Sequence, residues 1–237
     1  MYSEILEAET PAEKLKEYKG IIFSGGPQSV YDPDSVKCDP EILKLGVPIL
    51  GICYGHQLIV DRFGGRIRKS NVREYGSSNL VIDDNKDLFS NIKGNIRCWM
   101  SHSDTAESIP KDFEVLAHTD SSSSAAIVNR NKKLFGIQFH PEVLHTESGT
   151  EILRNFSFRI SEAAPAWNMK DFLESSISEI RNKVGKDRVL CAVSGGIDST
   201  TVAVMLHKAV GNNLRCVFVN HGLLRGGEEE LVVQSFE

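Results

Sequence analysis

The stretch Val47-Pro-Ile-Leu-Gly-Ile-Cys-Tyr-Gly-His-Gln57 decides the fold of this chain. It is apolar up to Cys53 and then continues, from Leu58 to Phe63, in a pattern typical of a helix. An apolar strand that turns directly into a helix presents the turn residue at the carboxyl edge of a parallel sheet, where function tends to sit. The stretch therefore predicts an α/β domain with Cys53 at its functional edge.

Two glycines flank this cysteine symmetrically. Gly51 and Gly55 lie two residues before and after Cys53, which is the spacing of a nucleophile elbow with Cys in place of Ser. The start of a helix would add free N–H groups and a positive dipole end, and both favour the thiolate. A lone cysteine after a strand is more often a buried structural residue. The flanking glycines favour a nucleophile instead.

The overall composition is that of a globular protein. The chain has 237 residues, of which 41% are hydrophobic and 25% charged, and its net charge is −5. This suits one large domain or two smaller ones. The charges form no basic patch, so we expect no nucleic-acid partner and no membrane binding. No apolar run is long enough for a membrane helix.

The cysteines indicate a reducing compartment. There are five, scattered along the chain, with no Cys-x-x-Cys pair. This usage argues against a disulfide framework and against a structural zinc site. No signal peptide is recognisable. We expect a cytoplasmic protein without a metal-ligand set.

The residues around the elbow have the alternating pattern of a parallel α/β sheet. We expect strands at residues 2–6, at 21–23 and at the elbow itself. A capping box at Thr10 with Pro11 predicts a helix to about Lys19, and Asp39 caps a second short helix that ends before Gly46. Between them, Ser24-Gly25-Gly26-Pro27 is either a plain turn or a loop whose N–H groups face a ligand.

From residue 66 to residue 139 the pattern changes to short strands, most clearly at 95–100, 114–119, 125–129 and 134–139. The motif His140-Pro-Glu142 closes this block. Side chains two apart on a strand point the same way, so His140 and Glu142 are expected to share a face. This suits a general base oriented by a carboxylate, as in a catalytic triad with a Cys nucleophile. A lone His–Glu pair is more often a surface pair.

Gly51-Ile-Cys-Tyr-Gly-His-Gln57 and His140-Pro-Glu142 together resemble the signatures of the class I glutamine amidotransferases. The resemblance extends over about residues 2–160 and implies a three-layer α/β domain with a central, mostly parallel sheet over residues 1–160. It implies that Cys53 attacks the side-chain amide of glutamine, that His140 transfers the proton and that Glu142 orients His140.

The same resemblance assigns roles to three further residues. The N–H groups of Gly26 and Tyr54 would stabilise the tetrahedral intermediate, a contribution that is typically a few kcal/mol. Gln57 would help to position glutamine, although an amide at this place could equally cap or pack. His102 is interpreted as lining the glutamine pocket, because a triad needs only one base.

A second domain follows a linker at residues 161–168. In the segment 169–237 an amphipathic helix begins after Asn168 and stops at Gly185. A strand at 188–193, a helix at 200–210 and a strand at 214–219 then form a βαβ unit.

The loop between the first strand and the helix of this unit has the composition of an anion cradle, because free N–H groups and hydroxyls converge on a positive helix end. It is not a Walker A loop. Its residues are Ser194, Gly195, Gly196, Ile197, Asp198 and Ser199. They resemble the pyrophosphate loop of the ATP pyrophosphatase superfamily, of the adenine-nucleotide α-hydrolase-like fold. This implies ATP and Mg²⁺ as substrate and ion, with no prosthetic group.

The order of the two signatures resembles the glutamine-hydrolysing GMP synthetase family, as do residues 143–146, Trp167 and residues 222–225. The resemblance implies that ammonia from glutamine attacks an adenylyl-XMP intermediate to give GMP, and that the full-length proteins are homodimers. Asn220-His221 departs from the family, which usually has an acidic residue first. We expect this chain to be a fragment that retains at most the glutaminase half. The alternatives are a glutaminase subunit of another synthase and a catalytically silent remnant.

Overall fold

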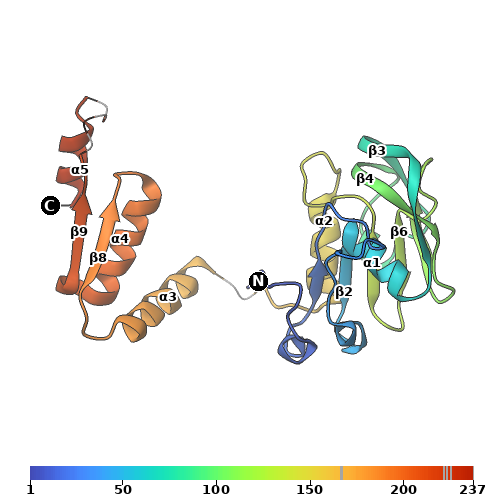
Figure 1. Cartoon of the computed structure of the whole chain (residues 1–237), viewed down its shortest axis with the longest axis horizontal. Coiled ribbons are helices and arrows are strands. Elements are labelled where there is room, and N and C mark those ends of the chain that lie inside the picture. Colours follow the sequence, from blue (N-terminus) through green and yellow to red (C-terminus); the bar gives the residue numbers. More distant parts are fainter. Residues whose placement is uncertain (166–167, 221, 223, 225, 237) are drawn as a thin grey trace. The chain divides into compact units, whose positions relative to one another are not determined.

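The computed structural model describes the backbone of the chain except residues 166–167, 221, 223, 225 and 237, and it describes the side chains of the remaining residues except 70–73, 228 and 235–236. The chain divides into two compact units, Ser3–Pro165 and one built mainly of Ala166–Glu237 (Figure 1). Each is described by itself. Of the residues that carry the family resemblance, Trp167, Leu223 and Arg225 lie outside the described residues, as does His221.

The first unit is built on one seven-stranded sheet with the strand order β1-β2-β7-β6-β5-β3-β4. The strands are β1 (Ile21–Phe23), β2 (Ile49–Ile52), β3 (Arg66–Ile82), β4 (Ile96–Ser108), β5 (Glu114–His118), β6 (Ala126–Asn129) and β7 (Leu134–Ile137). The strands β1, β2 and β7 pair in parallel, and the pairings from β7 through to β4 are antiparallel. The parallel strands of the sheet are therefore the ones that carry the elbow.

The central strands have an apolar layer on each face, so this unit has three layers. Ile49 of β2 belongs to the cluster that contains Ile59 of helix α1 (Tyr54–Arg62). Its neighbour Leu50 belongs to the opposite cluster, which contains Ile152 of α2 (Gly149–Arg154) and, in the π-helical turn Asn155–Ile160, Phe156. Alternation along buried strands thus fastens α1 and α2 to opposite faces of the sheet (Figure 1).

The glycines of the elbow allow β2 and α1 to approach each other closely. A methyl group on Gly51 would stand 2.4 Å from the carbonyl carbon of Gly55, and one on Gly55 would stand 2.3 Å from the carbonyl oxygen of Phe23. Cys53 between them has φ 52° and ψ −102°. The predicted strand–elbow–helix arrangement is confirmed.

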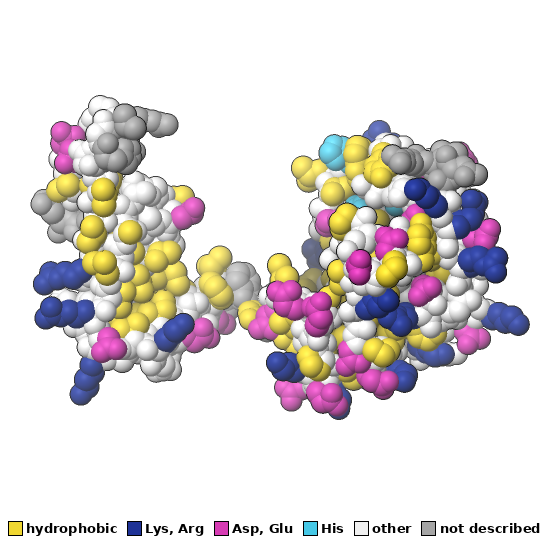
Figure 2. Space-filling view, viewed as in Figure 1, with side chains coloured by type: hydrophobic (Ala, Val, Ile, Leu, Met, Phe, Trp, Pro, Cys, Tyr) yellow, Lys and Arg dark blue, Asp and Glu magenta, His cyan; other side chains and the backbone are white. Residues whose placement is uncertain are grey.

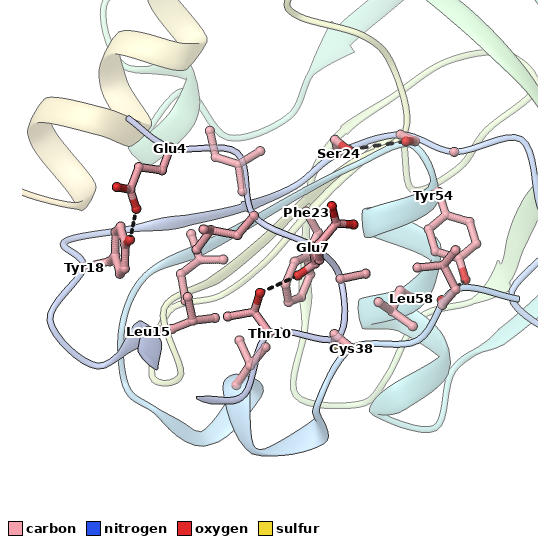
Figure 3. Close-up of a pocket in the computed structure, with 18 of the residues that line it drawn as sticks. Glu4, Glu7, Thr10, Leu15, Tyr18, Phe23, Ser24, Cys38, Tyr54 and Leu58 are labelled. Carbon is pink, nitrogen blue, oxygen red and sulfur yellow. Dashed lines mark hydrogen bonds between the residues drawn. The ribbon is translucent and has the colours of Figure 1, made fainter. Parts of the chain in front are cut away.

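The prediction of a strand at residues 2–6 was wrong. These residues form no regular element, and Ile5 is fully exposed. Strand β1 is the end strand of the sheet and pairs with β2 only, so no neighbouring strand holds residues 2–6 in line. Leu6 instead lines a groove of about 420 Å³ beside β1, at whose rim Tyr18 donates a hydrogen bond to Glu4 (Figure 3).

The helix predicted for residues 11–19 is only a 3₁₀ turn, Ala12–Leu15, and Thr10 does not cap it. The Asp39 carboxylate accepts the N–H of Ala12 (2.9 Å) from across the chain and also caps its own 3₁₀ turn, Pro40–Lys44, through Glu41 N–H (3.0 Å). These backbone bonds lower the pKa of Asp39. One carboxylate therefore fastens the starts of both short turns. A third 3₁₀ turn is Asp87–Phe89.

The strands predicted at 114–119, 125–129 and 134–139 are confirmed as β5, β6 and β7, whereas the one predicted at 95–100 is the first part of a long hairpin. β3 has 17 residues and β4 has 13. The burial of β4 alternates through its polar half as well, with His102 and Asp104 buried like the apolar residues before them. The spacing of apolar residues in the sequence did not predict this half of β4, because its buried side chains are polar. β7 ends at Ile137, so His140 and Glu142 lie beyond the strand rather than on it.

The second unit contains α3 (Met169–Val184), β8 (Val189–Val193), α4 (Ile197–Val210), the 3₁₀ turn Gly211–Asn213, β9 (Leu214–Phe218) and α5 (Glu228–Phe236). β8 and β9 pair in parallel and α4 connects them, as predicted, although α4 begins three residues earlier than expected. Asn168 caps α3 through the N–H of Asp171 (2.9 Å). The buried core of this unit is small. Hydrophobic side chains gather on the face of the unit that Figure 2 shows. The exposed hydrophobic residues of this unit include Leu190, at 73% exposure.

Among the residues that the structure describes, no helix is long and apolar enough to cross a membrane.

We predict that Gly51→Ala destabilises the first unit far more than Gly64→Ala. The first methyl group would meet the backbone of Gly55, whereas the second has no atom within 4 Å and suffers only the strain of φ +84°. We expect losses of about 3 kcal/mol or more and about 1 kcal/mol respectively. Urea unfolding of the full chain measures both losses in the free energy of unfolding. Equal losses would show that position 51 does not require glycine because of the close approach to Gly55.

Candidate active site

A cavity of about 560 Å³ opens above the elbow. Its walls come from the loop after β1, the start of α1, the polar half of β4 and the turn after β7. The lining residues that matter for the chemistry are Gly25, Gly26, Cys53, Gln57, His102, Asp104, His140 and Glu142. Sequence segments up to about 120 residues apart therefore meet in one pocket, and most of the residues predicted for the glutaminase site line it.

Cys53 is buried, and its surroundings keep the sulfur protonated at rest. The thiol donates to the Ser101 carbonyl oxygen at 3.7 Å. Burial raises the pKa of the thiol to about 11, although the backbone N–H of Tyr54 faces the sulfur and lowers the pKa. The N–H group at the helix start does favour the thiolate, as expected, but desolvation outweighs it.

His140 and Glu142 form a close pair. His140 Nδ1 lies 2.6 Å from Glu142 Oε1, and the glutamate side chain is about half exposed. The shared face predicted for a strand is replaced by a turn, but the contact between the two side chains is present. A methyl group on Gly25 would stand 3.1 Å from His140 Cε1 and 3.6 Å from Cys53 Cβ. Gly25 thus lies against both the imidazole and the cysteine, and its missing side chain leaves room between them.

The backbone of His140 is fastened to β4. Its N–H donates to the Trp99 carbonyl oxygen (3.0 Å), and its own carbonyl accepts from the Thr146 hydroxyl (2.5 Å). The same hydroxyl accepts the N–H of Trp99 (3.0 Å), and the Trp99 ring packs on His145 with centroids 4.6 Å apart. The imidazole is therefore positioned by a strand as well as by Glu142.

Of the two residues assigned to the oxyanion site, Tyr54 adjoins the sulfur and Gly26 adjoins Tyr54. Tyr54 N–H faces Cys53 Sγ, as described above. Gly26 lies against the Tyr54 ring, since a methyl group on Gly26 would be 3.6 Å from Tyr54 Cγ. The Tyr54 hydroxyl in turn donates to the Val36 carbonyl oxygen (2.5 Å). The glycine loop and the helix start are thus held side by side.

Gln57 borders the pocket but directs its amide into the protein. Its Nε2 donates to the Asp104 carbonyl oxygen (3.0 Å) and to Gln138 Oε1 (3.2 Å). Gln138 Nε2 in turn donates a hydrogen bond to Cys53 Sγ (3.7 Å). The packing role left open for Gln57 fits these contacts better than a direct contact with substrate.

Three polar residues of the site were missed from the sequence: Gln138, Asp104 and Glu74. Asp104 is only 4% exposed, and its carboxylate accepts hydrogen bonds from the hydroxyls of Ser29 and Tyr31. Glu74 lies 3.2 Å from His102 Nε2, its register partner across β3 and β4. The only available signal was the buried alternation of residues 100–104, because the position of Glu74 depends on a strand register.

In the second unit, the predicted pyrophosphate loop is exposed and closed by its own serines. The hydroxyls of Ser194 and Ser199 lie 3.1 Å apart, and Ser199 also accepts the Ser194 N–H (3.1 Å). Gly195 has φ +77°, which lets the chain turn into α4. The loop therefore gathers two hydroxyls at the start of a 14-residue helix.

We predict that Cys53 is alkylated slowly at neutral pH. A pKa of about 11 leaves roughly one thiol in ten thousand ionised at pH 7, and the thiolate fraction rises about tenfold for each pH unit. The reaction rate of Cys53 with iodoacetamide, followed by mass spectrometry of its peptide, should therefore increase up to at least pH 10. A plateau below pH 8 would contradict the burial argument.

The sequence model of the family "Glutamine amidotransferase class-I" matches residues 1–160. Among curated proteins, the whole chain is 49% identical to a protein of Synechocystis and 50% identical to one of Nostoc, both called GMP synthase (glutamine-hydrolyzing). The chain spans only 44% of the length of these relatives.

A solved structure from Thermoplasma acidophilum, provisionally described as one subunit of GMP synthase, is 27% identical and superposes with a TM-score of 0.59 over 67% of this chain and 80% of that one. It supports the fold, and the family match covers the whole elbow and His140-Pro-Glu142. The chain therefore belongs to the class I glutamine amidotransferase family.

Proposed function

We propose that the first unit hydrolyses glutamine to glutamate and ammonia, with Cys53 as nucleophile. One observation carries the proposal: a buried cysteine on a strained elbow and a histidine 2.6 Å from a carboxylate line the same cavity, on either side of Gly25. This is the arrangement that nucleophilic acyl transfer requires.

The high pKa of the resting thiol determines how the reaction begins. Because the sulfur is neutral at rest, His140 removes its proton as Sγ attacks the amide carbon of glutamine, and Glu142 stabilises the imidazolium that results. The imidazolium then protonates the departing nitrogen, so ammonia leaves and a thioester remains. Water activated by His140 cleaves the thioester to give glutamate and the free thiol.

The oxyanion of each tetrahedral intermediate forms beside the sulfur. Tyr54 N–H already faces this position in the resting structure. Gly26, packed on the Tyr54 ring, would supply a second N–H. Donors fixed in place before the reaction stabilise the charge without reorganisation, which is why such groups contribute strongly to the rate.

The cavity also offers a place for the amino-acid end of glutamine. The Asp104 carboxylate is buried in the wall, and among the side chains that the structure describes two hydroxyls donate to it and no cation pairs with it. An α-ammonium group would supply the missing positive charge. We therefore assign substrate recognition to Asp104 rather than to Gln57.

For the longer protein we propose GMP synthesis from XMP, ATP and glutamine. Support comes from the relatives called GMP synthase (glutamine-hydrolyzing) and from the loop of residues 194–199. In this proposal the second unit is the start of an ATP pyrophosphatase domain, and the loop binds the pyrophosphate of ATP with Mg²⁺. ATP would adenylylate XMP, and ammonia would displace AMP to give GMP.

A second candidate is a glutaminase subunit that serves a separate synthase. The Thermoplasma acidophilum protein, whose description is that of a single subunit, favours it, and so does the compactness of residues 3–165. The two candidates differ in whether residues 194–199 bind ATP.

We predict that a chloroketone analogue of glutamine labels Cys53, and that Cys53→Ala abolishes the label. His140→Ala should reduce both labelling and glutamine hydrolysis by roughly 10²- to 10⁴-fold, because the general base is lost. Peptide mass spectrometry and glutamate release measure the two effects. Cys216→Ser, which changes an exposed thiol of the second unit, is the matched control. Folded chain that shows neither labelling nor hydrolysis would support the silent remnant instead.

We predict that the full chain binds Mg²⁺–ATP at residues 194–199. Gly195→Val should abolish binding, because even its Cβ would stand 2.3 Å from Val232 Cγ2 at a φ of +77°. Ser199→Ala should weaken binding by about threefold to tenfold through the loss of one hydroxyl. Calorimetric titration measures both. Wild-type affinity in both variants would favour the second candidate, a glutaminase that serves a separate synthase.

A further inference from the structure

A continuous line of polar contacts leads from the β3–β4 hairpin to the sulfur of Cys53. It runs through buried side chains from β3, β4, α1 and the end of β7. In order, its members are Glu74, His102, the carbonyl of Asp104, Gln57, Gln138 and Cys53. The glutaminase chemistry proposed above gives the first five of these no role in the transfer of atoms.

Glu74 is an anion at the start of this line. Burial acts to raise its pKa, but contacts with His102, Ser121 and Ser78 outweigh burial and lower the pKa to about 2. The Ser78 hydroxyl lies 3.0 Å from the carboxylate, and Thr119 lies at 3.4 Å. Glu74 therefore only accepts hydrogen bonds and is fixed in place.

His102 is held between two acceptors. Its Nε2 is 3.2 Å from Glu74 Oε2, and its Nδ1 is 2.9 Å from the Asp104 carbonyl oxygen. Both partners are acceptors; the contact with the Asp104 carbonyl is a hydrogen bond, whereas the one with Glu74 is a close approach without hydrogen-bond geometry. The Asp104 oxygen also accepts from Gln57, and its two lone pairs are then both used.

The Asp104 carbonyl determines how the side-chain amides of Gln57 and Gln138 are oriented. The group of Gln57 at 3.0 Å from the Asp104 carbonyl must be the NH₂ group, because a carbonyl cannot donate. Its other N–H faces Gln138 at 3.2 Å, so that contact must be with the Gln138 oxygen. Gln138 is thereby forced to turn its own NH₂ group toward Cys53 Sγ.

We propose that Gln138 is a positioning residue whose amide N–H stabilises negative charge on the Cys53 sulfur, that Gln57 and the Asp104 carbonyl set this donating orientation, and that Glu74 and His102 fix the position of that carbonyl. The proposal rests on the proposed role of Cys53 as nucleophile. A hydrogen bond to sulfur strengthens as the sulfur gains charge, so it favours the attacking thiolate over the resting thiol. The bond from Gln138 acts on the pKa of Cys53 in this direction, against burial.

A purely structural role of Gln138 would give a different result. Gln138 is fully buried, and a buried amide with satisfied hydrogen bonds contributes to stability whatever it faces. Stability alone does not change how the sulfur of a folded chain titrates. The pH dependence of the Cys53 reaction therefore separates the two roles.

The test is the rate of iodoacetamide alkylation of Cys53 in the full chain between pH 7 and pH 11, read from its peptide by mass spectrometry. In Gln138→Leu we expect the rate at pH 8 to fall by about threefold to tenfold, with the profile displaced to higher pH, because one donor is lost. Gln138→Glu, which has the same shape but an acceptor in place of the NH₂ group, should reduce the rate further. Glu142, Asp104 and His140, the other titratable groups near the sulfur, are unchanged in both variants.

Glu74→Gln tests the remote end of the line. It removes the anion that His102 faces, and we expect a smaller fall in the same direction. Ser77→Ala, an exposed change on the same strand, should behave as wild type. The double variant of Glu74→Gln with Gln138→Leu should be no slower than Gln138→Leu alone, because Glu74 acts through that amide.

Wild-type profiles in folded Gln138→Leu and Gln138→Glu chains would overturn the role of Gln138. Additive effects in the double variant would overturn the link to Glu74. If Gln138→Leu does not fold, Gln138→Glu and Glu74→Gln still decide the matter. Alkylation needs no glutamine, so a chain without glutaminase activity would contradict the proposed function while leaving these profiles measurable.

Discussion

The backbone of Cys53, a non-glycine residue at φ 52°, is the constraint on which the rest of the first unit depends. Such a conformation costs of order 1–3 kcal/mol and persists only where the surroundings determine it fully. Here Gly51 and Gly55 let β2 and α1 approach so closely that the chain must reverse within one residue. The sulfur consequently stands at the carboxyl edge of the parallel strands, facing the wall that β4 provides.

The mixed sheet explains why that wall is polar. The three parallel strands supply the elbow and the glycine loop, and their interior is apolar. The antiparallel hairpin then brings Ser101, His102 and Asp104 alongside the sulfur, where buried polar groups need partners. They find them in one another and in Gln57 and Gln138. The site is therefore a polar inclusion between two apolar cores, which is why burial raises the pKa of Cys53 while hydrogen bonds lower it.

What was predictable from sequence was local. The elbow and the contact between His140 and Glu142 could be predicted, because spacing along the chain determines them. Glu74 and Gln138 could not, because their contacts depend on strand register and on partners up to 85 residues away. The net pKa of Cys53 could not be predicted for the same reason: the helix start, which favours the thiolate, is visible in the sequence, whereas the burial that outweighs it comes from the whole fold. The start of the turn at Ala12 likewise depends on a distant partner, because the carboxylate that accepts its N–H is that of Asp39.

The fastening of His140 to Trp99 and Thr146 also has a mechanical consequence. β4, the strand to which the backbone of His140 is hydrogen-bonded, also forms the wall of the cavity at His102 and Asp104. His140 itself follows β7 by three residues, and β7 pairs with β2 and accepts the N–H of Cys53. The histidine therefore links the two halves of the sheet, and a substitution that shifts β4 should disturb the cavity wall and the imidazole together, even though it lies outside the elbow.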